Sequence, residues 1–372
     1  MSKEKILLIQ LFSNGDCLFV TTIAKQIKKN NPDCELTWIV SSRCSSMLLQ
    51  NPDVDIVEEV EITDVSQNRI VFEQVVKEAR IKKQAGVYAQ VIVPQLLGTN
   101  LKFYNGVVCT SLFKSSGLKI DVDTRPVLIL DEKEKTAAKQ FAEKHQLQIY
   151  KNVVLFECAP QTNQLLLTDE LILGYAKQVV KNESTCVILS APKAYHFQHP
   201  QIINGNVLSI RETVALTHYC TLLLGCSSGI SWAATSIAAK SLPTVQLLAK
   251  NAYYFNPLSL TFFKLKRSAD TLIEMIEFDK QKLSEVFEDI FSKGFQQARS
   301  KHHQQVQVQF RLYRGIINGF LKEGKCSEIV TFVKINYKEH GFNFQMLKYM
   351  LLGIVLFPFQ WIMDDMIKIN KS

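Results

Sequence analysis

Short apolar runs alternate with amphipathic stretches along the first 250 residues of the chain. Runs such as residues 6–12, 35–40 and 185–189 have the length of buried strands, and segments with helical spacing of apolar positions lie between them. Strands separated by helices are typical of βαβ units and a mostly parallel sheet. The pattern therefore predicts an α/β fold with doubly wound sheets.

The alternation starts again near residue 152, which indicates a second domain. The predicted elements are strands near 6–12, 35–40, 55–60, 88–93, 153–156, 185–189, 206–210 and 242–248, and helices near 17–30, 44–50, 68–84, 131–146, 168–181 and 211–219. Residues 121–130 are expected to form a connector or an edge strand. The predicted units are two α/β domains, residues 1–145 and 146–270, and a helical extension, residues 271–372.

Two strand-to-helix junctions stand out within this pattern. In the first, an apolar run enters the turn 13–16, and in the second a run ending at residue 224 enters the turn 225–229. The first amides of a helix have no intrahelical partner, so such a helix start can bind an anion or present a side chain at the carboxyl edge of a parallel sheet. Two such junctions suggest two nucleotide-binding-type domains that face each other across a cleft.

Composition narrows the class of protein. A chain of 372 residues with 47% hydrophobic residues can bury more than one core, and 43 basic against 35 acidic residues favour anionic partners. No long Lys/Arg block is present, so we expect no nucleic acid partner. The nine cysteines form no Cys-x-x-Cys pair, which favours buried free thiols and a cytoplasmic location.

Asp16 is the candidate catalytic residue of the first junction. Asp is a preferred residue at helix starts, where it stabilises by about 0.5–2 kcal/mol with no catalytic role. The turn Asn14-Gly15 nevertheless lies at the expected carboxyl edge of the sheet, where side chains commonly face a ligand. Local chemistry leaves the helix cap and the catalytic carboxylate as equal alternatives.

The second junction offers amides and hydroxyls from Ser227, Ser228 and Gly229. They could bind a phosphate, or they could simply begin a Ser-capped helix. No Walker lysine follows the glycine, and the pattern Gly-x-Gly-x-x-Gly is absent from the chain. This argues against a P-loop NTPase and against a standard NAD dehydrogenase.

The C-terminal segment 346–363 is apolar apart from four residues, Lys348, Gly353, Pro358 and Gln360. A spanning helix needs about 20 apolar residues, and Pro358 interrupts this run. Three alternatives follow: the segment inserts into a membrane surface, packs across the domains as a terminal helix, or spans the membrane.

The motifs at the two junctions resemble those of the lipopolysaccharide heptosyltransferases, glycosyltransferase family 9. The resemblance rests on residues 5–60, with Asn14-Gly15-Asp16 and Asn51-Pro52-Asp53, and on residues 225–234. With the order of strands and helices between them, it covers about residues 5–265.

The resemblance implies a GT-B architecture, in which two Rossmann-like domains face a cleft. The first domain would bind the acceptor through the loop Ser13-Asn14-Gly15, and the second would bind the nucleotide sugar. The family transfers a sugar with inversion, without a metal and without a cofactor other than the donor. Its Gly-Asp motif supplies the general base, which carries over to Asp16.

The chain departs from the family at the donor loop. Ser227 stands where the family usually has Asp, and Trp232 stands where it has His. Residues 157–163 lack the lysine that family members direct at the diphosphate, so Thr162 and Lys193 are candidate replacements, with Arg211 as another source of charge. Trp232 either stacks on a base or fills the core.

These observations predict a glycosyltransferase at the cytoplasmic face of the inner membrane. Its donor would be a nucleotide sugar, and its acceptor a lipopolysaccharide-type or other cell-envelope glycan or glycolipid. Segment 346–363 would bring it to the membrane surface as a peripheral protein. The alternatives are a nucleotide-sugar epimerase of the same architecture and a catalytically inactive GT-B module that binds a glycan or a partner.

Overall fold

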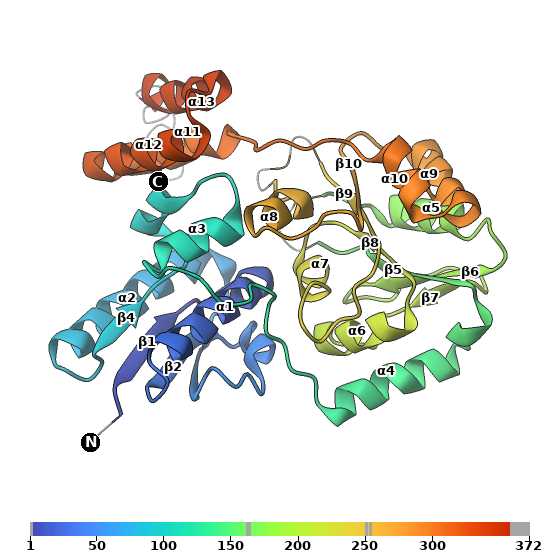
Figure 1. The fold of residues 1–372 in the computed structure, drawn as a ribbon, viewed down its shortest axis with the longest axis horizontal. Coiled ribbons are helices and arrows are strands. Elements are labelled where there is room, and N and C mark those ends of the chain that lie inside the picture. Colours follow the sequence, from blue (N-terminus) through green and yellow to red (C-terminus); the bar gives the residue numbers. More distant parts are fainter. Residues whose placement is uncertain (1–2, 161–164, 250–251, 253–254, 358–372) are drawn as a thin grey trace, which may run out of the picture.

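The computed structural model describes the chain except for residues 1–2, 161–164, 250–251, 253–254 and 358–372. It contains two separate parallel sheets, each with helices packed on it, and a C-terminal helical group that lies over the first domain (Figure 1). The α/β fold with two Rossmann-like domains expected from the sequence is confirmed.

The first sheet has four parallel strands in the order β3-β2-β1-β4. Its strands and helices are β1 Lys5–Ile9, β2 Glu35–Ser41, β3 Ile56–Val60, β4 Gln90–Ile92, α1 Asn14–Asn30, α2 Asn68–Gln84 and α3 Val108–Ser115. The segment expected as a helix at 44–50 is a single 3-10 turn, Ser45–Leu48. Because β1 is a central strand and its apolar residues are buried, its carboxyl end leads the chain from the middle of the sheet into α1.

The second sheet has six parallel strands in the order β10-β9-β8-β5-β6-β7. Its strands are β5 Asn152–Glu157, β6 Thr185–Ser190, β7 Ile202–Asn204, β8 Leu222–Gly225, β9 Thr244–Leu247 and β10 Leu272–Met275. The helices of this part of the chain are α5 Asp169–Val179, α6 Ile210–Leu216, α7 Gly229–Ala233, α8 Leu258–Lys264, α9 Lys280–Lys293 and α10 Phe295–His302. β10 is the edge strand, so this sheet extends past residue 270, where we expected the extension to begin.

The strand expected at 206–210 is not formed. The sheet takes residues 202–204 instead, and α6 starts at Ile210. Ser209 caps this helix: its side chain accepts the amide of Glu212, and the Glu212 carboxylate accepts the amide of Ser209. This capping box stabilises a helix start in place of a strand.

The connector between the domains runs over residues 121–130 without forming a strand. It leads into α4, Glu132–Lys144, whose side chains Ala138 and Phe141 pack in one core cluster with Val153 and Leu155 of β5. α4 therefore lies on the second domain (Figure 1), and the boundary falls in the connector, before the position expected at 145.

The C-terminal group contains α11 Arg311–Lys322, α12 Cys326–His340 and α13 Phe344–Val355. It packs on the first domain through Tyr104 and Tyr313, whose rings meet edge to face at 6.0 Å. In α13 the residues Met346, Met350 and Gly353 are buried, and a Cβ on Gly353 would lie 2.8 Å from Ile317 Cβ, so one face of this helix packs on α11. Residues 358–363 lie outside the described part. No helix of the described residues is long and apolar enough to cross a membrane.

Candidate active site

Asp16 lies in the first turn of α1, three residues after the N-cap Ser13. Its half-buried carboxylate accepts a hydrogen bond from the backbone N–H of Ser13, so it does help to cap the helix. Burial raises the pKa of Asp16 to about 7, and the bond from Ser13 offsets only part of that rise. A carboxyl group with this pKa is partly ionised at neutral pH and can both accept and hold a proton.

The second junction is a tight loop between β8 and α7. Ser227 has a φ of 63°, in the left-handed region that a residue with a side chain adopts at a cost. Its buried hydroxyl donates a hydrogen bond to the carbonyl of Asn256. A Cβ on Gly225 would lie 2.5 Å from Ser231 Oγ, so only glycine fits where the loop begins.

Glu157 accepts hydrogen bonds from this loop. Its carboxylate, at the end of β5, accepts the amides of Cys226 at 2.8 Å and Ser231 at 3.0 Å, with a longer bond of 3.4 Å from Ser228. The hydroxyls of Ser228 and Ser231 donate to it as well. Glu157 is 1% exposed. An internal carboxylate thus takes the Ser228 amide and hydroxyl, which the sequence suggested for a phosphate, while the amide of Ser227 donates to Ser231 Oγ.

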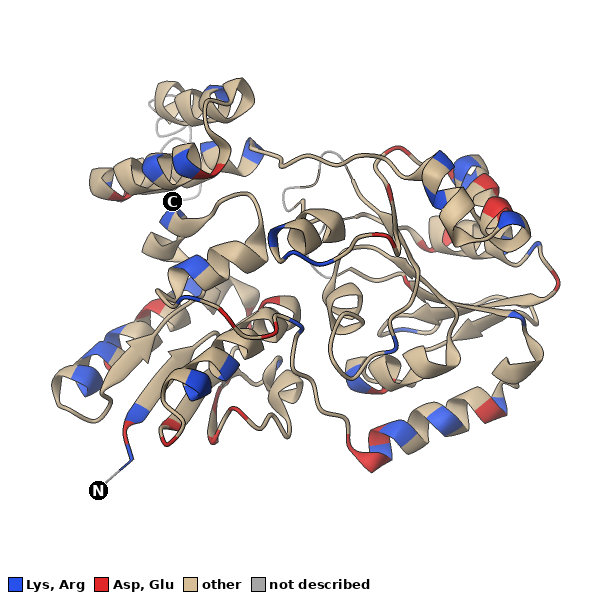
Figure 2. Cartoon of the chain, viewed as in Figure 1, with Lys and Arg blue, Asp and Glu red and all other residues tan. Residues whose placement is uncertain are grey.

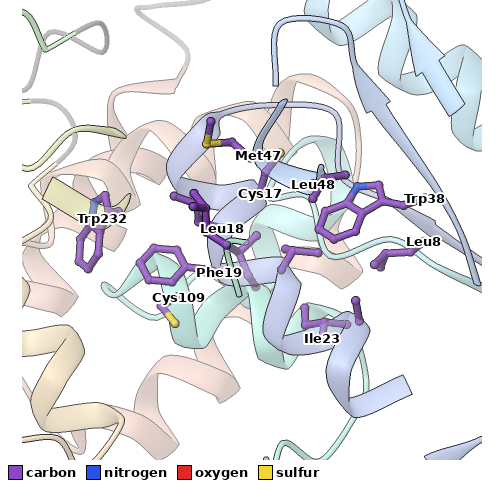
Figure 3. Packing of buried hydrophobic residues seen from close by; sticks show 14 of the residues in the cluster. Leu8, Cys17, Leu18, Phe19, Ile23, Trp38, Met47, Leu48, Cys109 and Trp232 are labelled. Carbon is purple, nitrogen blue, oxygen red and sulfur yellow. The ribbon is translucent and has the colours of Figure 1, made fainter. Parts of the chain in front are cut away.

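The two junctions touch across the domain boundary (Figure 3). The rings of Phe19 and Trp232 meet edge to face with centroids 4.7 Å apart, and a Cβ on Gly15 would lie 3.1 Å from Trp232 Cδ1. A Cβ on Gly229 would lie 3.7 Å from Asn14 Cβ. Trp232 is 3% exposed and belongs to the core cluster of the first domain, so the interpretation of this side chain as a core residue is confirmed.

Asn14 adds a polar atom to this contact. Its Oδ1 is buried and has no hydrogen-bond partner among the described residues. Buried acceptors are usually paired, because leaving one unpaired costs about 1–3 kcal/mol. Asn14 therefore provides an acceptor two residues from Asp16 that can receive a hydroxyl or amine proton.

The other predicted donor-site residues are not gathered at this contact. Lys193 forms an exposed ion pair with Asp169, with Nζ 2.8 Å from Oδ1. Thr162 lies outside the described residues. Within the described residues, no three His, Cys, Asp or Glu side chains are grouped as a metal site.

Arg211 joins the domains instead of facing a donor. Its buried guanidinium pairs with Glu134 of α4, and it donates to the carbonyl of Ser46 in the first domain at 3.0 Å and to the carbonyl of Ile129 in the connector. A buried arginine with a fork of donors can satisfy several acceptors at once. The expectation that Arg211 supplies charge to a diphosphate is not supported by these contacts.

Sequence reasoning did not identify Glu157 as a site residue. Its partners follow it by 69 to 74 positions, so only the fold brings them together. The available indication was a carboxylate at the end of an otherwise apolar run, at the predicted carboxyl edge of a sheet. Gln246 and Glu274 are likewise polar side chains inside apolar strands, and both are fully buried and accept amides at the start of α8.

No family model and no curated protein matches the sequence. Among solved structures, the chain is similar to a glycosyltransferase family 9 protein from Veillonella parvula DSM 2008, with 14% identity and a TM-score of 0.53 over 78% of this chain and 89% of that one. It is also similar to the ADP-heptose lipopolysaccharide heptosyltransferase II of E. coli, with 14% identity and a TM-score of 0.50 over 79% and 99% of the two chains. The chain therefore has the GT-B fold of glycosyltransferase family 9, and the resemblance found in its sequence is confirmed at the level of the fold.

Proposed function

We propose that the protein is an inverting, metal-independent glycosyltransferase that moves a sugar from a nucleotide sugar to a lipopolysaccharide-type or other cell-envelope glycan at the cytoplasmic side of the membrane. One observation carries the proposal: a half-buried carboxyl, Asp16, with a pKa of about 7 lies beside the contact between the two junctions. The fold supports it, because a solved relative in fold is named as an ADP-heptose transferase.

Asp16 would act as the general base. In its ionised form it takes the proton of an acceptor hydroxyl, whose oxygen then attacks the anomeric carbon while the bond to the nucleoside diphosphate breaks. Asn14 Oδ1, buried and unpaired among the described residues, would receive a second hydrogen of the acceptor and orient it. We expect the rate to rise with pH through about 7, because only the ionised carboxylate accepts the proton.

The donor must be held differently from the pattern that the sequence suggested. The Glu157 carboxylate lies where a phosphate would bind at the loop. A diphosphate there would meet amides that already donate to Glu157, and it would be repelled by a charge of the same sign. Binding at this loop would require Glu157 to leave its partners.

The pairing of these donors favours a second candidate function, a GT-B module that binds a glycan or partner without turnover. In the described residues Lys193 is paired with Asp169, and the amide and hydroxyl of Ser228 are paired with Glu157. A module of this kind would bind sugar and release no nucleotide.

Purified protein incubated with a panel of nucleotide sugars and a cell-envelope glycan extract tests the two candidates through release of nucleoside diphosphate. We expect release from wild type, loss of at least about a hundredfold in Asp16→Asn, and no change in Asp33→Asn, the matched control on an exposed turn. Full turnover by Asp16→Asn would refute the base assignment. Glycan binding with no release from any donor would favour the module.

A further inference from the structure

Helix α12 exposes an apolar stripe to solvent. Val330, Val333 and Tyr337 are exposed and are spaced by three and four residues, which places them on one face of the helix. An adjacent side of α12 holds Phe332 and Asn336, both buried, and the Asn336 side chain donates to the carbonyl of Tyr104 at 3.0 Å. The packed face and the apolar exposed face are therefore distinct.

The turn after α12 and the helix α13 continue this surface. Phe342 and Phe344 are 79% and 72% exposed, and Leu351 and Val355 follow Phe344 on one face of α13. Single aromatic side chains that project from a turn are not the walls of a groove for a peptide. They are typical of side chains that enter the boundary between lipid headgroups and acyl chains.

The exposed charges that the structure describes on α12 and α13 are all positive. Lys334 and Lys338 on α12 and Lys348 on α13 are exposed and form no ion pair with any residue that the structure describes. The acidic residues of these helices, Glu328 and Glu339, are paired with lysines of neighbouring helices (Figure 2 shows the charges along the extension).

The ion pairs of Glu328 and Glu339 join α12 to neighbouring helices at short distances. Glu328 pairs with Lys102 at 2.9 Å, and Glu339 pairs with Lys264 at 2.6 Å and Lys114 at 3.3 Å. These lysines hold the pKa of Glu339 below its usual range, against the effect of burial. Both acidic groups are thus neutralised, and the outer face presents apolar side chains and lysines.

We propose that the outer face of α12, the turn 341–343 and α13 docks on an anionic lipid bilayer, with Phe342 and Phe344 entering the interface and Lys334, Lys338 and Lys348 contacting lipid phosphates. An amphipathic surface with lysines binds such a membrane through both apolar area and charge. The helices lie on the membrane and do not cross it. This proposal is independent of Asp16 and of any sugar transfer.

Flotation of the full-length protein with vesicles tests the proposal. We expect binding to phosphatidylcholine vesicles that contain phosphatidylglycerol, and little binding to phosphatidylcholine alone. Binding should be weaker in about 0.5 M than in about 0.1 M salt, because salt screens the attraction between lysines and lipid phosphates. Lys334→Glu/Lys338→Glu and Phe342→Ser/Phe344→Ser should each lower the bound fraction at least about tenfold.

Two matched variants serve as controls on α2 and the turn after it. Lys82→Glu/Lys83→Glu makes the same charge change, and Ile81→Ser/Val87→Ser removes exposed apolar side chains away from the extension. Both should bind vesicles like wild type. Equal losses in test and control variants would contradict a specific docking face, and so would no binding to anionic vesicles.

A dimer formed through this face would give a result different from membrane docking. If light scattering shows a dimer that Phe342→Ser/Phe344→Ser converts to a monomer, with vesicle binding unchanged, the face contacts a second copy of the chain and the membrane proposal is refuted. Thermal unfolding of each variant checks that the exposed substitutions leave the fold intact.

Discussion

Gly15 and Trp232 lie against each other across the domain boundary, so that a Cβ on Gly15 would lie 3.1 Å from Trp232 Cδ1. The contact places the second domain directly beside the residue that precedes Asp16. Trp232 thus couples the packing of the two domains to the position of the candidate base.

Truncating this side chain should destabilise the protein. Trp232→Ala removes a buried ring that packs on Phe19, and we expect the free energy of unfolding to fall by about 3–5 kcal/mol. Urea denaturation measures this free energy. Phe263→Ala, at an exposed position, is the control and should change the value by less than about 0.5 kcal/mol. Equal small effects would mean that the ring contributes little to packing.

Adding a methyl group at Gly15 should not give the stabilisation that the same change gives at Gly319. Both glycines lie in helices, where alanine is favoured by about 0.5–1 kcal/mol. A Cβ on Gly319 would meet nothing within 4 Å, so Gly319→Ala should stabilise by that amount. Gly15→Ala meets Trp232 and should lose the gain. Equal stabilisation in both variants would show that Trp232 can shift to accommodate a methyl group at Gly15 without loss of stability.

The stability of the protein should depend on the ionisation of Asp16. Its pKa is about 7 in the folded protein and about 3.9 in an unfolded chain. Because the folded value is higher, the protonated carboxyl adds to the free energy of unfolding. This contribution is fully present below about pH 4 and is lost as the pH rises to about 7. Asp16→Asn should therefore match wild type at low pH and exceed its stability by about 2–4 kcal/mol above pH 7.

Urea denaturation of both proteins between pH 4 and 8 measures this difference. Asp33→Asn, at an exposed position, is the control for the same substitution outside the site. The same pH dependence of the difference in both variants would contradict the raised pKa of Asp16.

Removing the charge of Glu157 should improve diphosphate binding while weakening the fold. Glu157→Gln loses an acceptor of buried amides, and we expect destabilisation by about 1–3 kcal/mol. The shift in melting temperature caused by a nucleoside diphosphate should increase, because the like charge is gone.

Glu274→Gln is the matched control for this experiment. Glu274 is also a buried carboxylate of a parallel strand, β10, and accepts the amide and hydroxyl of Ser259. Glu274→Gln should destabilise the protein without changing the shift in melting temperature that a nucleoside diphosphate causes. If both variants respond alike, the loop of Glu157 is not where a diphosphate binds.

The sequence predicted the helices and strands that can be recognised from the spacing of apolar residues within one segment. The helix expected at 68–84 is α2 with the same bounds, and the strand expected at 35–40 is β2 with one residue added. The expected strand at 206–210 was wrong because its apolar residues lead into a helix, and the capping box of Ser209 and Glu212 was the local feature that could have corrected it.

The site was less predictable because it depends on contacts between distant segments. Asp16 was identified from its turn, yet its pKa depends on how much protein surrounds it, which one turn does not determine. The pairing of Glu157 with Ser228 and the packing of Trp232 on Gly15 each join residues separated by dozens of positions or more. Such contacts follow from strand order and domain orientation.

The contacts of Arg211 have a consequence for motion. Its guanidinium is bonded at once to the first domain through Ser46, to the connector through Ile129 and to α4 through Glu134. A rotation that separates Gly15 from Trp232 disturbs these bonds least when its axis passes close to Arg211. Arg211 therefore restricts how the two domains can separate, because most rotations would break its buried hydrogen bonds.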